Sequence, residues 1–251
     1  MNALASALVR GLDPVALAAD LELDLDPWQA GVLRSDADVL VNGARQVGKS
    51  TISALKVLHR ALYLPGSLSL LVAPAHRQSL EIFRTAIQLY KALGRPVPEE
   101  ALNTMALGLG NGSRILALPG SEQTLRGYGA VSLIVIDEAA RVPDALYHSV
   151  RPMLAVSHGQ MVAISTPNGR GGWWYEAWTS GSRWARYTVR ASDCPRISAE
   201  YLDEQRREMP GWMYEQEFEG TFGDSDLRAF RTEDIEAAFD PELEPWALTS
   251  A

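Results

Sequence analysis

The sequence has 251 residues and a formal net charge of −8; 47% of its residues are hydrophobic and 22% are charged. A chain of this kind can bury one substantial core, and no apolar stretch approaches the ~20 residues that cross a bilayer. The single cysteine excludes an internal disulfide framework, and the acidic balance argues against a surface that binds nucleic acid everywhere, although it allows a local basic track. We therefore expect one soluble, intracellular domain with no membrane partner.

Apolar runs alternate with helical patterns along the chain, which predicts an α/β fold with a mostly parallel central sheet flanked by helices. Residues 1–20 carry leucines at helical spacing and are expected to form an N-terminal helix. Helices are also expected at 49–63 and 78–93, a hairpin over 104–118, and strands at 36–42, 68–73, 131–136, 159–165 and 184–189. The acidic, helical stretch 198–220 is expected to be a subdomain of a domain spanning 1–225, followed by a linker or tail at 226–251.

Residues 43–50 read GARQVGKS and match the phosphate-binding (Walker A) pattern G-x-x-x-x-G-K-[ST] between a strand and a helix. In such a loop the backbone N–H groups wrap the phosphates, the lysine reaches the β and γ oxygens, and the serine hydroxyl binds magnesium. We therefore predict an ATP and Mg²⁺ site, with Ser50 as a metal ligand and Lys49 as a catalytic cation. Its nucleotide-binding residues would be Gly43, Ala44, Arg45, Gln46, Val47, Gly48, Lys49, Ser50 and Thr51.

An apolar run at 133–136 ends in two adjacent carboxylates, Asp137 and Glu138, as in a Walker B strand. Adjacent acids at a strand end could form a solvated turn, but a phosphate-binding loop earlier in the chain favours a catalytic interpretation. We predict that Asp137 orients the magnesium shell and that Glu138 polarises the attacking water. This pairing indicates the P-loop branch with a strand-borne catalytic glutamate.

Two weaker signals complete the predicted nucleotide site. Trp28 and Gln29, upstream of the first strand, resemble the glutamine motif of helicase-like motors, in which the glutamine reads the adenine edge; a core tryptophan and an exposed glutamine are the alternative. Ser165 and Thr166 end the strand expected beside the phosphate-loop strand, where a hydroxyl could sense the γ-phosphate and couple hydrolysis to motion. A strand-end turn is the alternative there.

The order of several short segments resembles that of the large terminase subunits of tailed bacteriophages. The resemblance covers nearly everything from Trp28 to Phe222, and beyond the two nucleotide motifs it rests on NGSRI at 111–115, LPG at 118–120, LRG at 125–127, VIDEAA at 135–140, STP at 165–167 and QEFEG at 216–220. Individually these segments are weak signals, whereas their order is specific. The resemblance identifies the chain as similar to the ATPase domain of such a motor protein.

What the resemblance implies is ATP hydrolysis that powers translocation of double-stranded viral DNA into a procapsid. It implies a homo-oligomeric ring on the capsid, with a monomer in isolation as the alternative, and partners that include the portal protein and the small terminase subunit. The location would be the host cytoplasm and, transiently, the portal vertex. It assigns catalytic roles to Arg45 in the phosphate loop and to Arg126 as a finger that reaches a neighbour's nucleotide; a solvated loop arginine is the alternative for Arg126.

Family members usually continue into a nuclease domain, and the sequence ends at Ala251 where that domain would begin, so we expect no nuclease activity. Asp224, Asp226 and Asp240 are expected to be solvated linker acids. DNA contacts by Arg114 and Arg77 are a further expectation. Two alternatives to the packaging motor are a helicase-like DNA motor, which would need a second motor domain, and an ATP-dependent switch or adaptor that translocates nothing.

Overall fold

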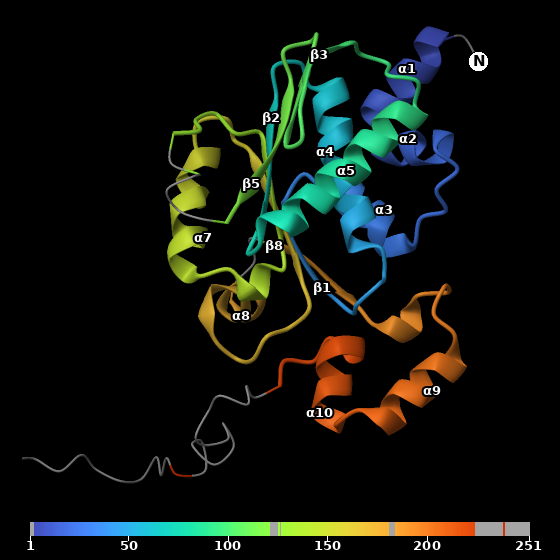
Figure 1. Ribbon diagram of the computed structural model, residues 1–251, viewed down its shortest axis with the longest axis vertical. Helices are drawn as coiled ribbons and strands as arrows, with labels where there is room; N and C mark the ends of the chain where they lie inside the picture. The colour runs from blue at the N-terminus through green and yellow to red at the C-terminus, as the bar shows by residue number, and fades with distance from the viewer. Residues whose placement is uncertain (1–2, 121–124, 126, 181–183, 224–237, 239–251) are drawn as a thin grey trace, which may run out of the picture.

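The computed structural model describes residues 3–120, 125, 127–180, 184–223 and 238. Within them the chain forms one eight-stranded sheet with helices on both faces, as predicted, and Figure 1 shows α4 and α5 on one side of the sheet and α7 and α8 on the other. The strand order is β3-β4-β5-β2-β6-β7-β1-β8. None of the described helices is long and apolar enough to span a bilayer.

Six neighbouring strands of this sheet are parallel. They are β5 (Arg114–Pro119), β2 (Leu68–Ala73), β6 (Leu133–Asp137), β7 (Gln160–Ser165), β1 (Asp38–Gly43) and β8 (Trp184–Val189). Strands β3 (Glu99–Leu102) and β4 (Ala106–Leu109) extend the β5 edge in antiparallel pairing. The sequence predicted the β4–β5 hairpin and missed β3, whose four residues are all exposed and carry no apolar alternation.

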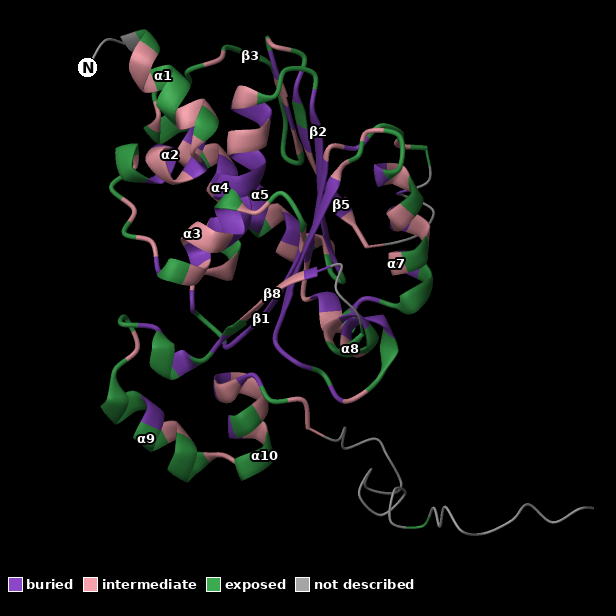
Figure 2. Cartoon of the chain, turned by 180° about the vertical axis from the view of Figure 1, so that it is seen from behind, coloured by how far each residue is buried: buried purple, intermediate pink, exposed green. Residues whose placement is uncertain are grey.

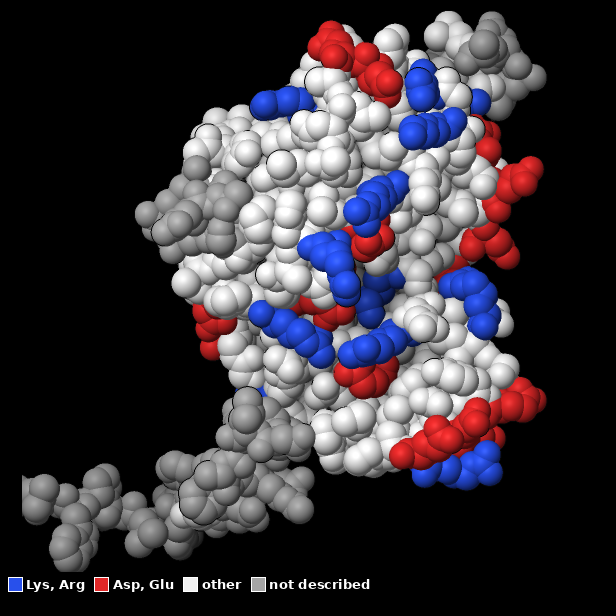
Figure 3. All heavy atoms as spheres, viewed as in Figure 1, with Lys and Arg blue, Asp and Glu red and all other residues white. Residues whose placement is uncertain are grey.

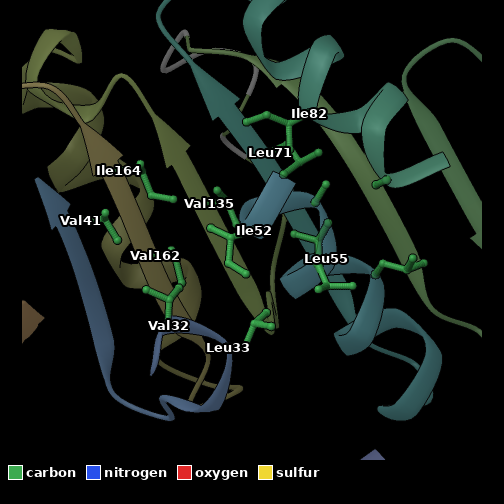
Figure 4. Close-up of a cluster of buried hydrophobic side chains, with 14 of the residues drawn as sticks. Val32, Leu33, Val41, Ile52, Leu55, Leu71, Ile82, Val135, Val162 and Ile164 are labelled. Carbon is green, nitrogen blue, oxygen red and sulfur yellow. The ribbon is translucent and has the colours of Figure 1, made fainter. Parts of the chain in front are cut away.

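The central strands are buried on both faces, which explains why they read as continuous apolar runs. Alternate residues of one strand enter different cores: Val135 of β6 packs on the face covered by α4 (Lys49–Tyr63) and α5 (His76–Ala92), whereas Ile136 packs on the face covered by α7 (Asp144–Val150) and α8 (Gly172–Thr179). Figure 2 shows the buried residues concentrated in the sheet and the sheet-facing sides of the helices. Figure 4 shows Ile52 and Leu55 of α4 against Leu71, Val135 and Val162 of the sheet.

The N-terminal segment forms two helices, α1 (Ala3–Leu12) and α2 (Pro14–Asp20), where the sequence predicted one. Asp13 lies between them in an extended conformation and accepts a hydrogen bond from the backbone of Val15, and Pro14 occupies the first position of α2. Asp13 is thus an N-cap followed by proline, a combination that starts a new helix and ends the preceding one. A third helix, α3 (Pro27–Arg34), leads into β1.

The segment after β8 is helical, as predicted. It contains α9 (Ala199–Glu208), α10 (Gly211–Tyr214) and a π-helical turn, Glu215–Glu219, which ends at Gly220. The buried side chain of Asn42, in β1, donates a hydrogen bond of 2.6 Å to the carbonyl oxygen of Gly220. This contact fixes the C-terminal helical segment beside the carboxyl end of β1, where the phosphate loop begins.

Candidate active site

The predicted phosphate loop connects β1 to α4, and its backbone takes conformations that few residues adopt. Gly48 has φ +94°, and a Cβ atom on it would lie 2.6 Å from Nε2 of Gln29. Only glycine fits here, because an L side chain would be strained in this region and would also collide. The loop therefore delivers Lys49 and Ser50 to the first turn of α4, whose N-terminal N–H groups attract anions.

Lys49 lies at the centre of the loop. Its Nζ donates hydrogen bonds to the carbonyl oxygens of Gly43, at 2.7 Å, and Ala44, at 2.6 Å. Burial lowers the pKa of Lys49 to about 8, while the carboxylates of Glu138 and Asp137 act in the opposite direction. The side chain is therefore a buried ammonium at pH 7 with two acidic groups nearby.

The acidic pair follows β6, and β7 lies between β6 and the phosphate-loop strand β1. Since the carboxyl ends of these parallel strands meet at one edge of the sheet, Asp137 and Glu138 lie opposite the loop. All of these groups line one open cavity of about 420 Å³, formed by Arg45, Gln46, Gly48, Lys49, Ser50, Thr51, Asp137 and Glu138. The fold thus brings together the two motifs that the sequence singled out.

Asp137 and Glu138 lie in different surroundings. Burial, and then the adjacent Glu138 charge, raise the pKa of Asp137 to about 6. Glu138 has a left-handed backbone conformation, φ 49°, which re-aims its side chain at the point where the strand ends. A hydroxyl and a carboxylate, Ser50 and Asp137, are oxygen ligands of the kind that Mg²⁺ takes beside phosphate. The donor set in the cavity therefore fits a magnesium–nucleotide complex.

Gln29 is almost completely buried, in contrast to the exposed side chain of the alternative interpretation. Its Oε1 accepts a hydrogen bond from the backbone N–H of Asp26 at 2.9 Å, and its Nε2 donates to the carbonyl of Val47 at 3.4 Å. Arg196 adds an ion pair with Asp26 at 2.6 Å. These contacts tie α3 to the back of the phosphate loop, and Trp28 packs against the core beside it.

Arg45 projects from the loop with its side chain 66% exposed and forms an ion pair with Glu217 of the π-helical turn. The backbone N–H of Arg45 also donates to the carbonyl of Glu217, at 3.2 Å. The predicted catalytic arginine in the loop is thus bound by the C-terminal helical segment. The sequence marked Glu217 only as part of a family segment, because the two residues are 172 positions apart.

Arg141 was not predicted as a site residue, yet it contacts two that were. Its Nη1 donates to Oε2 of Glu138 at 2.5 Å and to Oγ1 of Thr166 at 3.1 Å, and its Nη2 lies 3.9 Å from Oε1 of Glu217. Ser165 accepts a hydrogen bond from the backbone N–H of Ala140 at 3.1 Å. Ser165 and Thr166 therefore lie beside the acidic pair. The three-residue spacing between Glu138 and Arg141 was the only sequence signal for this contact.

The remaining predicted residues are more dispersed. Arg114 and Arg77 are exposed at opposite ends of the parallel strands, since Arg114 opens β5 while Arg77 follows the carboxyl end of β2. The structure does not bring them together. Arg126, Asp224, Asp226 and Asp240 lie outside the described residues. Among the described residues, no group of three or more His, Cys, Asp or Glu side chains could hold a metal ion.

Figure 3 shows Lys and Arg groups interleaved with acidic groups on one face of the molecule, between α5 and the α9–α10 segment. The charges at the cavity mouth are therefore mixed. Local pairs account for this: the P-loop arginine faces Glu217, and Arg196 faces Asp26.

Solved structures share this fold. The large terminase ATPase domain of Thermus phage P74-26 superposes with a TM-score of 0.72 at 22% sequence identity, covering 82% of this chain and 96% of that one. The large terminase of a second thermophilic bacteriophage, in complex with ADP, matches with a TM-score of 0.65 at 13% identity, over 79% of this chain and 54% of that one. The HK97 bacteriophage large terminase gives a TM-score of 0.62 at 16% identity, over 78% and 50%.

No curated protein sequence matches the chain. Residues 40–237, which include both nucleotide motifs, match the model of a family described as terminase large subunit, T4likevirus-type, N-terminal. The fold is that of the P-loop ATPase domains of phage large terminases. The chain therefore belongs to the large terminase subunit family of bacteriophages, in the N-terminal region that carries the P-loop fold.

Proposed function

We propose that the chain hydrolyses ATP and that hydrolysis drives double-stranded viral DNA into a procapsid. The observation that carries the proposal is the single cavity in which Lys49, Ser50, Asp137 and Glu138 converge. The second thermophilic phage terminase, which has the same fold, is described in complex with ADP and with ATP-γ-S. Membership of the large terminase family supports the packaging role.

In the proposed reaction, water attacks the γ-phosphoryl group in line, the bond to the β-phosphate oxygen breaks, and Glu138 takes the proton of the attacking water. Lys49 turns from the carbonyls of Gly43 and Ala44 towards the β and γ oxygens. Ser50 and Asp137 hold Mg²⁺, which supplies charge neutralisation at the phosphates. The N–H groups of the loop complete the phosphate cradle.

Positive charge for the transition state comes from two arginines in this proposal. Arg45 acts within its own subunit, exchanging the Glu217 carboxylate for a phosphate oxygen. Arg126 acts on the nucleotide of a neighbouring subunit in a homo-oligomeric ring. Trp28 and Gln29 remain candidates for the adenine end, with Gln29 acting through the loop that it supports.

We further propose that the ring assembles on the portal in the host cytoplasm, together with the small terminase subunit. Double-stranded DNA would contact exposed arginines, for which Arg77 and Arg114 are the candidates. Ser165 and Thr166, beside the acidic pair, would report the state of the nucleotide to the rest of the motor.

Two substitutions test the catalytic assignment. Lys49→Ala is expected to abolish tight ATP binding, because it removes the mobile cation aimed at the β/γ-phosphates. Glu138→Gln should retain binding and lose turnover by ~10²-fold or more, as expected for loss of a general base. Near wild-type hydrolysis by Glu138→Gln would refute the assignment of Glu138 as the base.

Steady-state hydrolysis with and without linear double-stranded DNA tests the motor. Stimulation by DNA is expected, and indifference in assembled rings would favour a switch. Mixing Arg126→Ala with Glu138→Gln should restore part of the activity, because a ring containing both pairs an intact glutamate with an intact neighbouring arginine. If the mixture stays inactive where wild-type rings hydrolyse ATP, the trans role of Arg126 is wrong.

We also propose that the chain does not cut DNA. Incubation of linear double-stranded DNA with the purified chain in Mg²⁺ or Mn²⁺ should leave the DNA intact. Cleavage that disappears on changing Asp224 or Asp226 would contradict this.

A further inference from the structure

Arg141 has a position that the reaction described above does not use. It ends the short 3₁₀ turn Ala139–Arg141, immediately after the acidic pair, and its side chain is 33% exposed. One guanidinium nitrogen contacts both the Glu138 carboxylate, at 2.5 Å, and the Thr166 hydroxyl, at 3.1 Å. The guanidinium thus joins the end of β6 to the residue that follows β7.

The backbone around these side chains is also fixed. The N–H of Arg141 donates to the carbonyl of Glu138 at 2.8 Å, and the N–H of Ala140 donates to the Ser165 hydroxyl at 3.1 Å. The turn is therefore held against the end of β7 by the main chain, and the guanidinium then determines where the Glu138 carboxylate lies within it. Because Glu138 is only 26% exposed and adopts a left-handed backbone, few other groups can fix its carboxylate.

From this geometry we propose that Arg141 is a positioning residue, which holds the Glu138 carboxylate in register for water activation and links it to Thr166. The inference rests on the proposed role of Glu138 as the general base. A charge-assisted Arg–carboxylate contact is short and directional, so it can fix an oxygen atom more tightly than a hydrogen bond between neutral groups. Arg141 acts through Glu138 and does not touch the phosphates.

A displaced base loses much of its catalytic power, because a shift of ~1 Å in a reacting group can cost ~10²-fold. Arg141→Ala should therefore lower kcat by ~10- to 100-fold and leave the ATP dissociation constant within ~3-fold of wild type, since Lys49 and the loop are untouched. Arg141→Lys, which keeps the charge without the planar fork, should give an intermediate kcat.

The decisive measurement combines Arg141→Ala with Glu138→Gln. If Arg141 works only through the carboxylate, the double variant should hydrolyse ATP within ~3-fold of Glu138→Gln alone, a clear departure from additivity. Thr166→Val should lower kcat to a smaller extent, and its effect should shrink in the Arg141→Ala background.

Asn168→Ala is a matched control for the turn itself. Asn168 donates a 3.4 Å hydrogen bond to the carbonyl of Ala140 in the same turn, without contacting the carboxylate. Its loss should leave kcat near wild type. The thermal midpoints of all variants should be compared, so that a misfolded protein is not scored as a catalytic defect.

Three results would overturn the proposal. They are a kcat of folded Arg141→Ala that equals or exceeds the wild-type value, an equal further loss in the Glu138→Gln background, or a large change in ATP affinity. The first would mean that Glu138 does not need this arginine, and the other two would mean that Arg141 acts on the nucleotide. If Glu138→Gln itself turns over normally, the assignment of the base fails instead.

Discussion

Lys56, on α4 behind the phosphate loop, offers a demanding test of how the loop is supported. Its side chain is 5% exposed, and its Nζ donates to the carbonyl oxygens of Val32 at 3.1 Å, Leu33 at 2.9 Å and Ser35 at 2.8 Å. These carbonyls belong to the last turn of α3 and its C-cap, which have no intrahelical partners. Burial lowers the pKa of Lys56 to about 8, so the ammonium form still predominates at pH 7.

Lys56→Met preserves the aliphatic length and removes the three donors. An unpaired buried carbonyl costs ~1 kcal/mol or more. Loss of the three contacts should therefore lower the free energy of unfolding by about 3 kcal/mol, since the carbonyl of Ser35 keeps its bond from Gln160. At ~2–4 °C per kcal/mol for a domain of this size, the thermal midpoint should fall by ~6–12 °C.

The assay is urea unfolding followed by tryptophan fluorescence at pH 7, with calorimetry for the midpoint. Arg34→Met is the matched control, because Arg34 pairs with Asp13 at 2.6 Å but its side chain is 55% exposed. An exposed ion pair contributes ~0–1 kcal/mol, so this variant should stay close to wild type. If Lys56→Met also stays within ~1 kcal/mol of wild type, the carbonyls are satisfied in another way and our explanation of the α3–α4 junction is wrong.

Two further predictions concern the cavity. Gly48→Ala should weaken ATP binding by at least ~10-fold, because it adds left-handed strain and pushes on Gln29, whereas Gly66→Ala, with φ +73° and no atom within 4 Å of its Cβ, should bind normally; isothermal titration would show whether the two differ. For Asp137, whose pKa is raised to about 6, the folded state binds more protons than the unfolded state between pH 4 and 6. The free energy of unfolding in EDTA should therefore fall as the pH rises through this window, by up to ~3 kcal/mol, and Asp137→Asn should flatten the dependence; an unchanged slope would count against the raised pKa.

Local patterns in the sequence were sufficient to predict the parallel strands, the helix after the phosphate loop and the placement of the two nucleotide motifs. Strands buried on both faces carry continuous apolar runs, and the loop has fixed glycine and lysine positions, so short segments contain the information. Because parallel strands expose their carboxyl ends at one edge, the pattern also implied that Lys49 and Glu138 would meet, and they line the same cavity. Strand β3 was missed, since its exposed residues have no such pattern.

The tertiary structure alone decided which partners these groups have. Glu217 reaches Arg45 from 172 residues away, and Arg141 meets Thr166 across 25 residues, because β7 packs between β6 and β1 and because Asn42 anchors the C-terminal segment to β1. Similarly, Gln29 is directed at the carbonyl of Val47 by the packing of α3 behind the loop. The chemistry of a residue is readable from short-range pattern, whereas the charge that faces it depends on distant segments that only folding brings together.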